Sequence, residues 1–508
     1  MRLPEVKIPD HGRSPALPAD GLGTPGYRAY VLNMLLLVYV LNFVDRGLLA
    51  VVARPLKAEI AISDTAWGLL TGFGFALLYS TAGLPIARLA ETKNRVWIMA
   101  ICLAFWSLMT AASGLAADIA IGGFVISGFW VLLVCRIGVG LGEAGCTPPA
   151  NSLIADYFAP RRRPAAIGYY AMGVMLGTLL AILVGGPVAD WLGWRATFLI
   201  LGLPGVAVAV ILILTTKEPP RGYTDPPDMP RPAEVSLREA WSELLSRPAY
   251  WWMVAGATIA GFCVYAIVSF QSLYLQRSFD LTAGEAALQF NAPAAAAGAL
   301  GTWLMGRMAS ALSHRSPGAV AWLAAGGLLA TVPFYLLAFT ASSLWLCAVS
   351  LALAYFVKYG YLGAQLTITQ GVVSMRVRAT ATAVLLFLIN LAGYGLGPLF
   401  AGYLSDASFA RAQSASIVAT DLTRTMCDAA QQQATEESRR AAAPLSGAEL
   451  QDVLAALPQP VTGAQYAFCL EANAASTQFS MLLIISLYVL AALAFAASGR
   501  RLRHDFQV

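Results

Sequence analysis

Five ionisable residues lie inside long apolar stretches of this 508-residue chain, where a charge is unfavourable. They are Asp45, Arg46, Arg136, Glu143 and Lys358. A charged side chain near the centre of a membrane-spanning helix costs roughly 2.5–3.5 kcal/mol, so it usually faces a water-filled cavity or a partner of opposite charge. The concentration of such residues in this chain indicates a polar pathway through a membrane.

Arg136 and Glu143 are seven residues apart in the stretch RIGVGLGEAG. In a helix this spacing places both side chains on one face, about 10.5 Å apart along the axis, so they line one cavity without contacting each other. Gly138, Gly140 and Gly142 stand between them, and glycines let a neighbouring helix or a substrate approach closely. The alternative interpretation is a packing seam that contains a single ion pair between helices.

Asp45 and Glu143 are the candidate proton-coupling residues, because a carboxylate whose partner changes during a conformational cycle binds and releases a proton. Arg136 is the candidate counter-charge for Asp45, or a bidentate ligand for an anionic head group. Asp45 and Arg46 are adjacent, and adjacent helical side chains point about 100° apart. We therefore expect Asp45 to face the cavity, and Arg46 to face a neighbouring helix or the outer interface.

Lys358 occupies a place in the second half of the chain broadly like that of Arg136 in the first. With Arg46 and Arg136, it is a candidate partner for a phosphate or carboxylate of the substrate. The alternative is a lysine that extends its amine towards the membrane surface. Further candidates for lining the cavity, each of which has packing or interface anchoring as its alternative role, are Tyr79, Tyr169, Gln271, Tyr355, Tyr359, Asn390 and Tyr394.

The elements that position these residues are membrane-spanning helices, since 58% of the chain is hydrophobic, only 12% is charged and the mean hydropathy is +0.65. A helix needs roughly 20 apolar residues to cross a bilayer. Twelve windows meet this length: 28–53, 65–88, 96–116, 123–147, 164–188, 195–215, 250–276, 284–309, 319–339, 343–369, 378–404 and 476–497.

The sequence lacks the motifs of several kinds of chemistry. The chain has no G-x-x-x-x-G-K-[ST] loop for ATP, and its three histidines lie outside the apolar windows without metal-ligand spacing. We expect no cofactor, no metal site and no enzyme activity. Transport driven by an ion gradient remains, with a membrane receptor that does not transport as the alternative.

Lys and Arg cluster in segments that fall on one side of the membrane if the spans alternate. The positive-inside rule then places both termini in the cytoplasm. The triple arginine at 161–163 is interpreted as a topology anchor rather than a nucleic-acid site. We expect a monomer that spans the lipid bilayer of a plasma membrane, specifically a bacterial inner membrane.

The predicted organisation is two six-helix halves joined by a loop. The divisions are a cytoplasmic tail 1–27, an N-terminal half 28–215, a cytoplasmic central loop 216–249, a C-terminal half 250–498 with an extracytoplasmic insert 405–475, and a cytoplasmic tail 499–508. Cys427 and Cys469 in the insert are the two cysteines beyond the apolar spans. In an oxidising compartment they form a disulfide, with two free thiols as the alternative.

Two loop segments carry a family resemblance. The segments RLAETKNR (88–95) and WLMGRMAS (303–310) follow or end the second and eighth spans. They resemble the loop G-x-L-A-D-R-x-G-R of the major facilitator superfamily, with Glu91 in place of Asp and Gly306 where the second copy has its acid. The resemblance implies that Glu91, Arg95 and Arg307 belong to gating loops.

Three further motifs resemble the spinster-like branch of this superfamily: NFVDR in the first span, RIGVGLGEAG in the fourth and LGWRATFL (192–199) before the sixth. Organic-anion symporters of the same superfamily share the D-R pair and a similar R…G…E-A run. The resemblance implies an all-α fold of two pseudo-symmetric halves, with Asp45, Arg136 and Glu143 matching the branch's charged positions. It further implies proton-coupled alternating access for an amphipathic anion such as a lysophospholipid or a sphingoid phosphate, with symport of small organic anions as the alternative.

Overall fold

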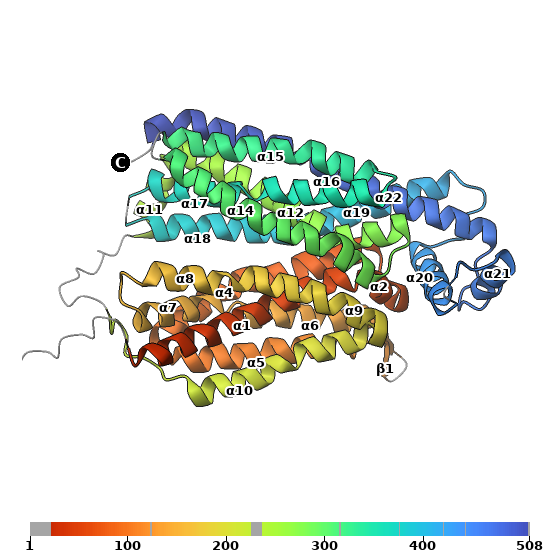
Figure 1. Cartoon of the computed structure of the whole chain (residues 1–508), viewed down its shortest axis with the longest axis horizontal. Coiled ribbons are helices and arrows are strands. Elements are labelled where there is room, and N and C mark those ends of the chain that lie inside the picture. Colours follow the sequence, from red (N-terminus) through yellow and green to blue (C-terminus); the bar gives the residue numbers. More distant parts are fainter. Residues whose placement is uncertain are drawn as a thin grey trace, which may run out of the picture.

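A computed structural model of the chain describes residues 22–121, 124–224, 236–313, 316–374, 376–419, 421–441 and 443–505. Most of the predicted N-terminal tail (1–27) and part of the predicted central loop (216–249) lie outside these residues. The described residues are mainly helical, and the helices form two bundles that lie side by side (Figure 1).

The first bundle, the N half, begins with a capped helix. The Oγ1 of Thr24 accepts a hydrogen bond from the backbone N–H of Tyr27 at 3.2 Å, which satisfies one of the unpaired donors at a helix start. The helices of this half are α1 Pro25–Val51, α2 Ala53–Ile60, α3 Asp64–Gly68, the π-helix η1 Leu69–Phe73, α4 Gly74–Thr92, α5 Arg95–Ser113, α6 Gly128–Glu143, α7 Thr147–Tyr157, α8 Arg163–Ala171, α9 Gly173–Gly202 and α10 Pro204–Thr215.

The second bundle, the C half, follows the short helix α11 (Leu237–Leu245), which Ser236 and Glu239 begin with a reciprocal capping box. Its other helices are α12 Pro248–Phe279, α13 Ala283–Glu285, the π-helix η2 Ala286–Asn291, α14 Ala292–Ser313, α15 Pro317–Thr340, α16 Leu344–Lys358, α17 Tyr361–Val372, α18 Arg378–Leu388, the π-helix η3 Ile389–Leu396, α19 Gly397–Ser414, α20 Arg424–Arg440, α21 Gly447–Ala455 and α22 Gly463–Asp505.

The described residues contain ten helical segments that are long and apolar enough to cross a membrane. One of them, Ala165–Thr215, has 51 residues and breaks at Gly193, whose φ of 82° and ψ of 162° favour glycine. The chain reverses there and crosses twice (Figure 1). Helix α14 packs along α15 and α16 as a further pass, so the described helices supply the twelve predicted passes.

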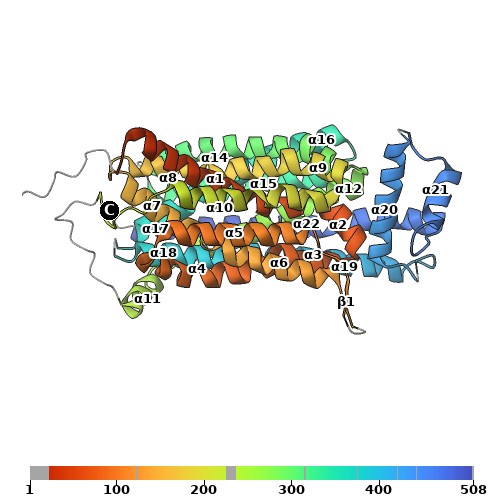
Figure 2. The same ribbon diagram turned by 90° about the horizontal axis from the view of Figure 1, so that it is seen from below.

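The span predicted at 123–147 starts differently in the structure. Strands β1 (Ile119–Ile121) and β2 (Phe124–Ile126) pair antiparallel, with Ile119 opposite Ile126, and the hairpin projects from the bundle (Figure 2). The helix α6 begins only at Gly128, after the cap residue Ser127. The β-branched residues of this segment favour a strand, which the count of apolar residues does not detect.

The two ends of the molecule differ. We call the end that carries α20 and α21 the insert end, and the opposite end, where α11 and the C-terminus lie, the tail end (Figures 1 and 2). Two membrane-spanning helices extend into the predicted insert 405–475. Helix α19 continues into it as far as Ser414, and helix α22 begins within it at Gly463. Helix α22 also continues into the predicted C-terminal tail, to Asp505.

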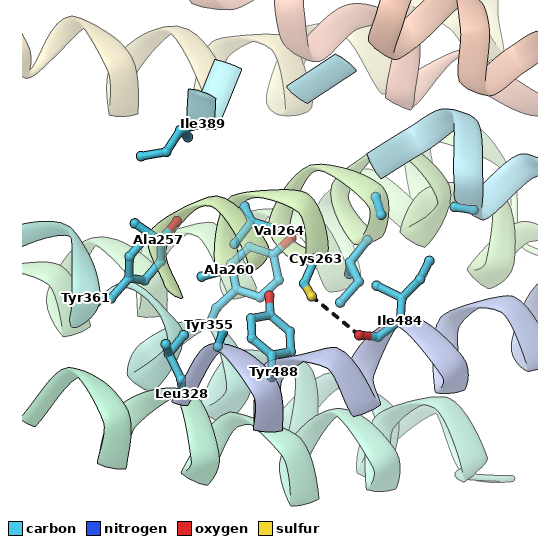
Figure 3. Close-up of a cluster of buried hydrophobic side chains, with 14 of the residues drawn as sticks. Ala257, Ala260, Cys263, Val264, Leu328, Tyr355, Tyr361, Ile389, Ile484 and Tyr488 are labelled. Carbon is cyan, nitrogen blue, oxygen red and sulfur yellow. Dashed lines mark hydrogen bonds between the residues drawn. The ribbon is translucent and has the colours of Figure 1, made fainter. Parts of the chain in front are cut away.

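The core of the C half is built from small residues on α12 against large ones on its neighbours. Ala257 and Ala260 lie among Leu328 of α15 and Tyr488 of α22 (Figure 3). The Cys263 thiol donates to the Ile484 carbonyl at 3.4 Å. This cysteine therefore packs as a small apolar residue, as expected for a free buried thiol.

The two halves pack against each other through backbone contacts towards the insert end. A Cβ on Gly68 of α3 would lie 2.2 Å from the Pro398 carbonyl oxygen of α19, and a Cβ on Gly402 would lie 2.0 Å from the Asp64 carbonyl oxygen. Only glycine permits such an approach. These close contacts hold α3 of the N half directly on α19 of the C half.

Candidate functional site

Helices α1 and α6 place the charged residues of the N half. Asp45 of α1 and Arg136 of α6 are both buried and line one small pocket, together with Thr110 and Ser113 of α5. The sequence prediction that Asp45 faces a cavity together with Arg136 agrees with this geometry. Asp45 and Arg136 nevertheless form no ion pair in the described structure; the guanidinium of Arg136 lies over the Phe75 ring, 4.6 Å from its centroid.

The ion pair of this region joins Arg46 to Glu143. The Nε of Arg46 donates to Oε2 of Glu143 at 2.6 Å, and the Glu143 side chain is fully buried. The prediction that Arg46 faces a neighbouring helix agrees with this contact. The contact observed for Glu143 is thus with Arg46, and the role of Arg136 as the counter-charge of Asp45 stays a prediction.

Arg46 also faces the C half. Its guanidinium carbon lies 4.6 Å from the ring centroid of Tyr79 and 5.9 Å from that of Tyr394, which belongs to η3. The rings of Phe43 and Phe75 lie 4.9 and 5.0 Å away. The faces of these aromatic rings stabilise the positive charge of Arg46 at the junction of the halves.

Several polar atoms here are buried and have no hydrogen-bond partner in the described structure. They include Oε1 of Glu143, Nε of Arg136 and both side-chain polar atoms of Asn42. Buried polar groups without partners are unfavourable unless water or a ligand satisfies them. The arrangement therefore suits a site that exchanges protons, water and a polar substrate group.

The glycines of α6 allow the close packing that the sequence predicted. A Cβ on Gly140 would lie 2.5 Å from the Phe75 carbonyl oxygen of α4, and one on Gly138 would lie 2.7 Å from the Met109 side chain of α5. Helix α6 is therefore held against α4 and α5 with its two charged residues fixed in position.

Lys358 lies in a cage of tyrosines in the C half. Its Nζ is fully buried, donates to the Tyr335 hydroxyl at 2.9 Å and lies 3.1 Å from the Tyr355 ring centroid and 4.7 Å from that of Tyr359. None of the described Asp or Glu side chains forms an ion pair with it. The amine does not extend to the surface, so the alternative interpretation of Lys358 does not fit this conformation.

The predicted cavity-lining residues divide into two groups and some outliers. Tyr79 and Tyr394 surround Arg46, and Tyr355 and Tyr359 surround Lys358. Gln271 is buried and donates to Asn291 at 2.7 Å. Outside these groups, Tyr169 is exposed and donates to Asn33 at 2.7 Å, while Asn390 is half-buried on η3.

The predicted gating-loop residues occupy different surroundings. Arg95 is fully buried and holds three elements together, since it pairs with Asp156 of α7 and with Glu218 after α10, the latter at 2.6 Å. Glu91 and Arg307 are exposed, and Arg307 lies over the Trp303 ring at 5.0 Å. Of the gating-loop candidates, Arg95 makes the contacts of a structural anchor.

In the structure Cys427 and Cys469 are joined by a disulfide that links α20 to the first turns of α22. Sequence reasoning missed a buried ion-pair network close to this disulfide. Its charged members are Lys57, Asp64, Arg277, Asp406, Arg424 and Asp428. They come from five separate helices, and Asp64, Arg277 and Arg424 stand in the first or last turn of theirs, where a charge gives no signal of burial.

Comparison with known proteins identifies the family. The sequence pattern described as Major Facilitator Superfamily matches residues 35–398. The chain belongs to the Major Facilitator Superfamily. The predicted fold, all-α with membrane-spanning helices in two halves, is confirmed by this match and by the helices above.

The relatives of this superfamily member place it in the spinster-type branch. It is 34% identical over 378 residues to the "MFS-type efflux pump" of Mycolicibacterium smegmatis, covering 74% of this chain and 84% of the relative. It is 27% identical over 407 residues to human "Protein spinster homolog 1", covering 75% and 74%. The predicted spinster-like branch is therefore confirmed, and the chain is a transporter rather than an enzyme.

A solved structure supports the same assignment. The crystal structure of a bacterial homologue of the human lysosomal transporter spinster, in an inward-facing and unoccupied conformation, is 37% identical to this superfamily member. The two superpose with a TM-score of 0.81, covering 96% of this chain and 100% of the other.

Proposed function

We propose that this chain is a proton-coupled secondary transporter that moves an amphipathic anion, of the class of lysophospholipids or sphingoid phosphates, by alternating access. The observation that carries the proposal is the buried Arg46–Glu143 ion pair at the junction of the halves, beside the pocket shared by Asp45 and Arg136. A purely structural role needs one such pair, not four ionisable groups with unpaired polar atoms between them.

The substrate's anionic group and Glu143 compete for Arg46 in this mechanism. While Glu143 is ionised it holds the Arg46 guanidinium at 2.6 Å. A proton on Glu143 removes the charge attraction and frees Arg46 to bind a phosphate or carboxylate in bidentate fashion. When the substrate leaves, Glu143 releases its proton and pairs with Arg46 again. Binding of the substrate to Arg46 therefore couples movement of the substrate to movement of the proton.

Asp45 is the second proton site in this proposal. It lies in the small pocket with Arg136, and Arg46 does not line this pocket. Movement of α1 relative to α6 changes the distance from Asp45 to the Arg136 charge, and this change shifts the balance between its neutral and ionised forms. Asp45 therefore takes up a proton in one conformation and releases it in the other.

Charges and rings together suit a molecule with an anionic head and a long apolar tail. Arg46 and Arg136 supply the cationic groups in the N half, and Lys358 supplies one among the tyrosines of the C half. The rings around both sites offer apolar surface for the tail. The relatives, which include spinster homologues and an efflux pump, support transport but not a particular substrate.

The proposed orientation places the insert end outside the cell and the tail end in the cytoplasm. The positive-inside distribution of Lys and Arg supports it, and so does the disulfide, which persists in an oxidising compartment. The packing of the halves at the insert end then makes this conformation inward-facing, like the similar bacterial structure. We propose a monomer in a bacterial inner membrane with the domain divisions given above.

A ligand screen tests the substrate class. Thermal unfolding of the purified protein is measured with lysophospholipids, sphingoid phosphates, their uncharged analogues and small carboxylates. We expect anionic lipids to raise the midpoint by several degrees and uncharged analogues to do so much less. Stabilisation by small carboxylates alone would replace the proposal with symport of small organic anions.

A further inference from the structure

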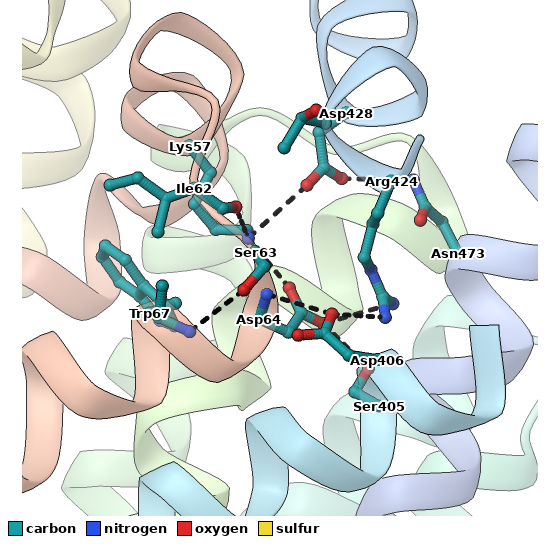
Figure 4. A network of polar contacts seen from close by, with 12 residues as sticks. Lys57, Ile62, Ser63, Asp64, Trp67, Ser405, Asp406, Arg424, Asp428 and Asn473 are labelled. Atoms are coloured by element: carbon teal, nitrogen blue, oxygen red, sulfur yellow. Dashed lines mark hydrogen bonds and ion pairs between the residues drawn. The ribbon is translucent and has the colours of Figure 1, made fainter. Parts of the chain in front are cut away.

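The buried ion-pair network at the insert end joins both halves of the transporter to the insert. Asp64, the first residue of α3 in the N half, lies beside Lys57, Arg424 and Asp406 (Figure 4). It accepts from Lys57 at 2.9 Å and from Arg277 of α12 at 2.8 Å. Arg424, the first residue of α20, lies 3.1 Å from the same carboxylate. One acid of the N half therefore binds two arginines from the other side of the junction.

Asp428 of α20 completes this network. Its carboxylate accepts from Arg277 of the C half at 2.8 Å and lies 3.6 Å from the Lys57 amine of the N half. Lys57, Asp64 and Asp428 are almost fully buried. Since an unpaired buried charge is strongly unfavourable, Asp64 and Asp428 together let Lys57 and Arg277 approach each other.

The backbone of α3 is bound to the C half at the same place. The N–H groups of Asp64 and Thr65 donate to the two carboxylate oxygens of Asp406 on α19, at 3.1 and 2.7 Å. Arg424 contacts Asp406 at 3.2 Å. These N–H groups lie at the start of a helix, where no carbonyl of the same helix can accept from them.

The disulfide fixes the part of the insert that supplies Asp428. Cys427, its immediate neighbour, is bonded to Cys469 of α22, and Asn473 of α22 donates to Asp428 at 3.1 Å. A small hydrophobic cluster around the disulfide, which includes Leu422, Leu454 and Tyr466, packs α20 against α21 and α22. Helix α20 is thus attached to the C half, and it also packs on α2 of the N half.

We propose that Asp428, held in place by the Cys427–Cys469 disulfide, is a gate residue that closes the insert end of the transporter. In the closed state it bridges Lys57 of the N half and Arg277 of the C half. Opening of this end separates Lys57 and Asp64 from Asp428, Arg277 and Asp406. The insert is therefore a working part of the alternating-access cycle, and the inference rests on that part of the proposed function.

Backbone hydrogen exchange of Asp64 and Thr65 reports opening directly, because their N–H groups bond across the two halves. The exchange is measured by mass spectrometry on the full chain in lipid nanodiscs. Three samples are compared: the wild type, the wild type treated with tris(2-carboxyethyl)phosphine, and Asp428→Asn. The phosphine cleaves the S–S bond to two thiols and is itself oxidised to the phosphine oxide. Glu437→Gln on the same helix is the matched control, since within the described residues Glu437 forms an ion pair only with Arg440 of its own helix.

Asp428→Asn and the reduced wild type are expected to exchange at Asp64 and Thr65 at least tenfold faster than the untreated protein, and Glu437→Gln is expected to match the untreated protein. Exchange in α7 at the tail end is expected to stay constant, which shows that the fold is intact. The reduced wild type carries no substitution, so it decides the question if Asp428→Asn does not fold. Faster exchange within α20 combined with unchanged protection of Asp64 and Thr65 would overturn the proposal. The measurement uses neither substrate nor a proton gradient, so its failure is distinct from a failure of proton-coupled transport.

Discussion

At the scale of single residues, the adjacent pair Asp45 and Arg46 serves two sites. The helical rotation between neighbours points Asp45 into the pocket with Arg136 and points Arg46 at Glu143 and the rings of the junction. The sequence predicted that the two side chains face different surroundings, and the roles assigned to them stay predictions. It did not identify the partner of Arg46, because that choice depends on how α1 and α6 lie in space.

Replacing Glu143 tests the competition for Arg46. In the wild type, anionic ligand binding should weaken as the pH rises, since the ionised Glu143 holds Arg46 more firmly than its protonated form does. Glu143→Gln should bind the ligand about tenfold more tightly at alkaline pH, equivalent to about 1.4 kcal/mol, and should lose this pH dependence. Titration calorimetry across the pH range measures the affinity and its pH dependence, and the exposed Glu91→Gln serves as the control. If Glu143→Gln bound the ligand at alkaline pH with the same affinity as the wild type, the proposed competition would be contradicted.

Replacing Lys358 tests whether its charge contacts the substrate. Lys358→Gln keeps a donor for the Tyr335 hydroxyl but removes the charge from the tyrosine cage. We expect at least fivefold weaker binding of an anionic lipid and little change for its uncharged analogue, measured in parallel with the exposed Lys93→Gln. Equal losses for both ligands would instead indicate a folding defect.

At the scale of elements, the close packing of α6 against α4 and α5 fixes the site. The approach is possible because Gly138 and Gly140 carry no side chain. The described residues also contain three π-helical segments, η1, η2 and η3, and each of them contacts a helix of the other half. Such segments frequently occur at functional sites.

Gly140→Ala tests this packing. Its Cβ would lie 2.5 Å from the Phe75 carbonyl oxygen, and overpacking of this kind costs about 1–3 kcal/mol. We expect a clearly lower midpoint of thermal unfolding in detergent. Gly83→Ala is the matched control, because nothing lies within 4 Å of its Cβ. If both variants unfolded at the wild-type temperature, α6 would have room to move and the packing argument would not hold.

Sequence patterns predicted the passes and the acid–arginine sites because hydrophobic length and intramembrane charge are local signals. The β1–β2 hairpin was missed because a count of apolar residues does not separate the β-branched ones, which favour strands, from the others. The network of Lys57, Asp64, Arg277 and Asp428 was missed for another reason. Its members are distant in sequence, and burial of a charge at a helix end depends on what the fold places beside it.

At the scale of the whole molecule, two bundles meet at the insert end through glycine contacts and buried ion pairs. The charged site lies where Arg46 of α1, which is paired with Glu143 of α6, approaches Tyr394 of η3 in the C half. A change in the angle between the halves therefore alters the gate and the site together. In the proposed cycle, the ion pairs of the gate and of the site therefore change when the transporter changes conformation.

Transport in proteoliposomes under an imposed pH gradient tests the central claim most directly. Purified wild-type protein and Asp45→Asn are reconstituted at equal density, and movement of an anionic lysolipid is followed in both directions with and without the gradient. The account predicts that the gradient changes the wild-type rate at least tenfold, while Asp45→Asn binds the lipid but no longer responds to the gradient. A response of Asp45→Asn equal to that of the wild type would contradict the account.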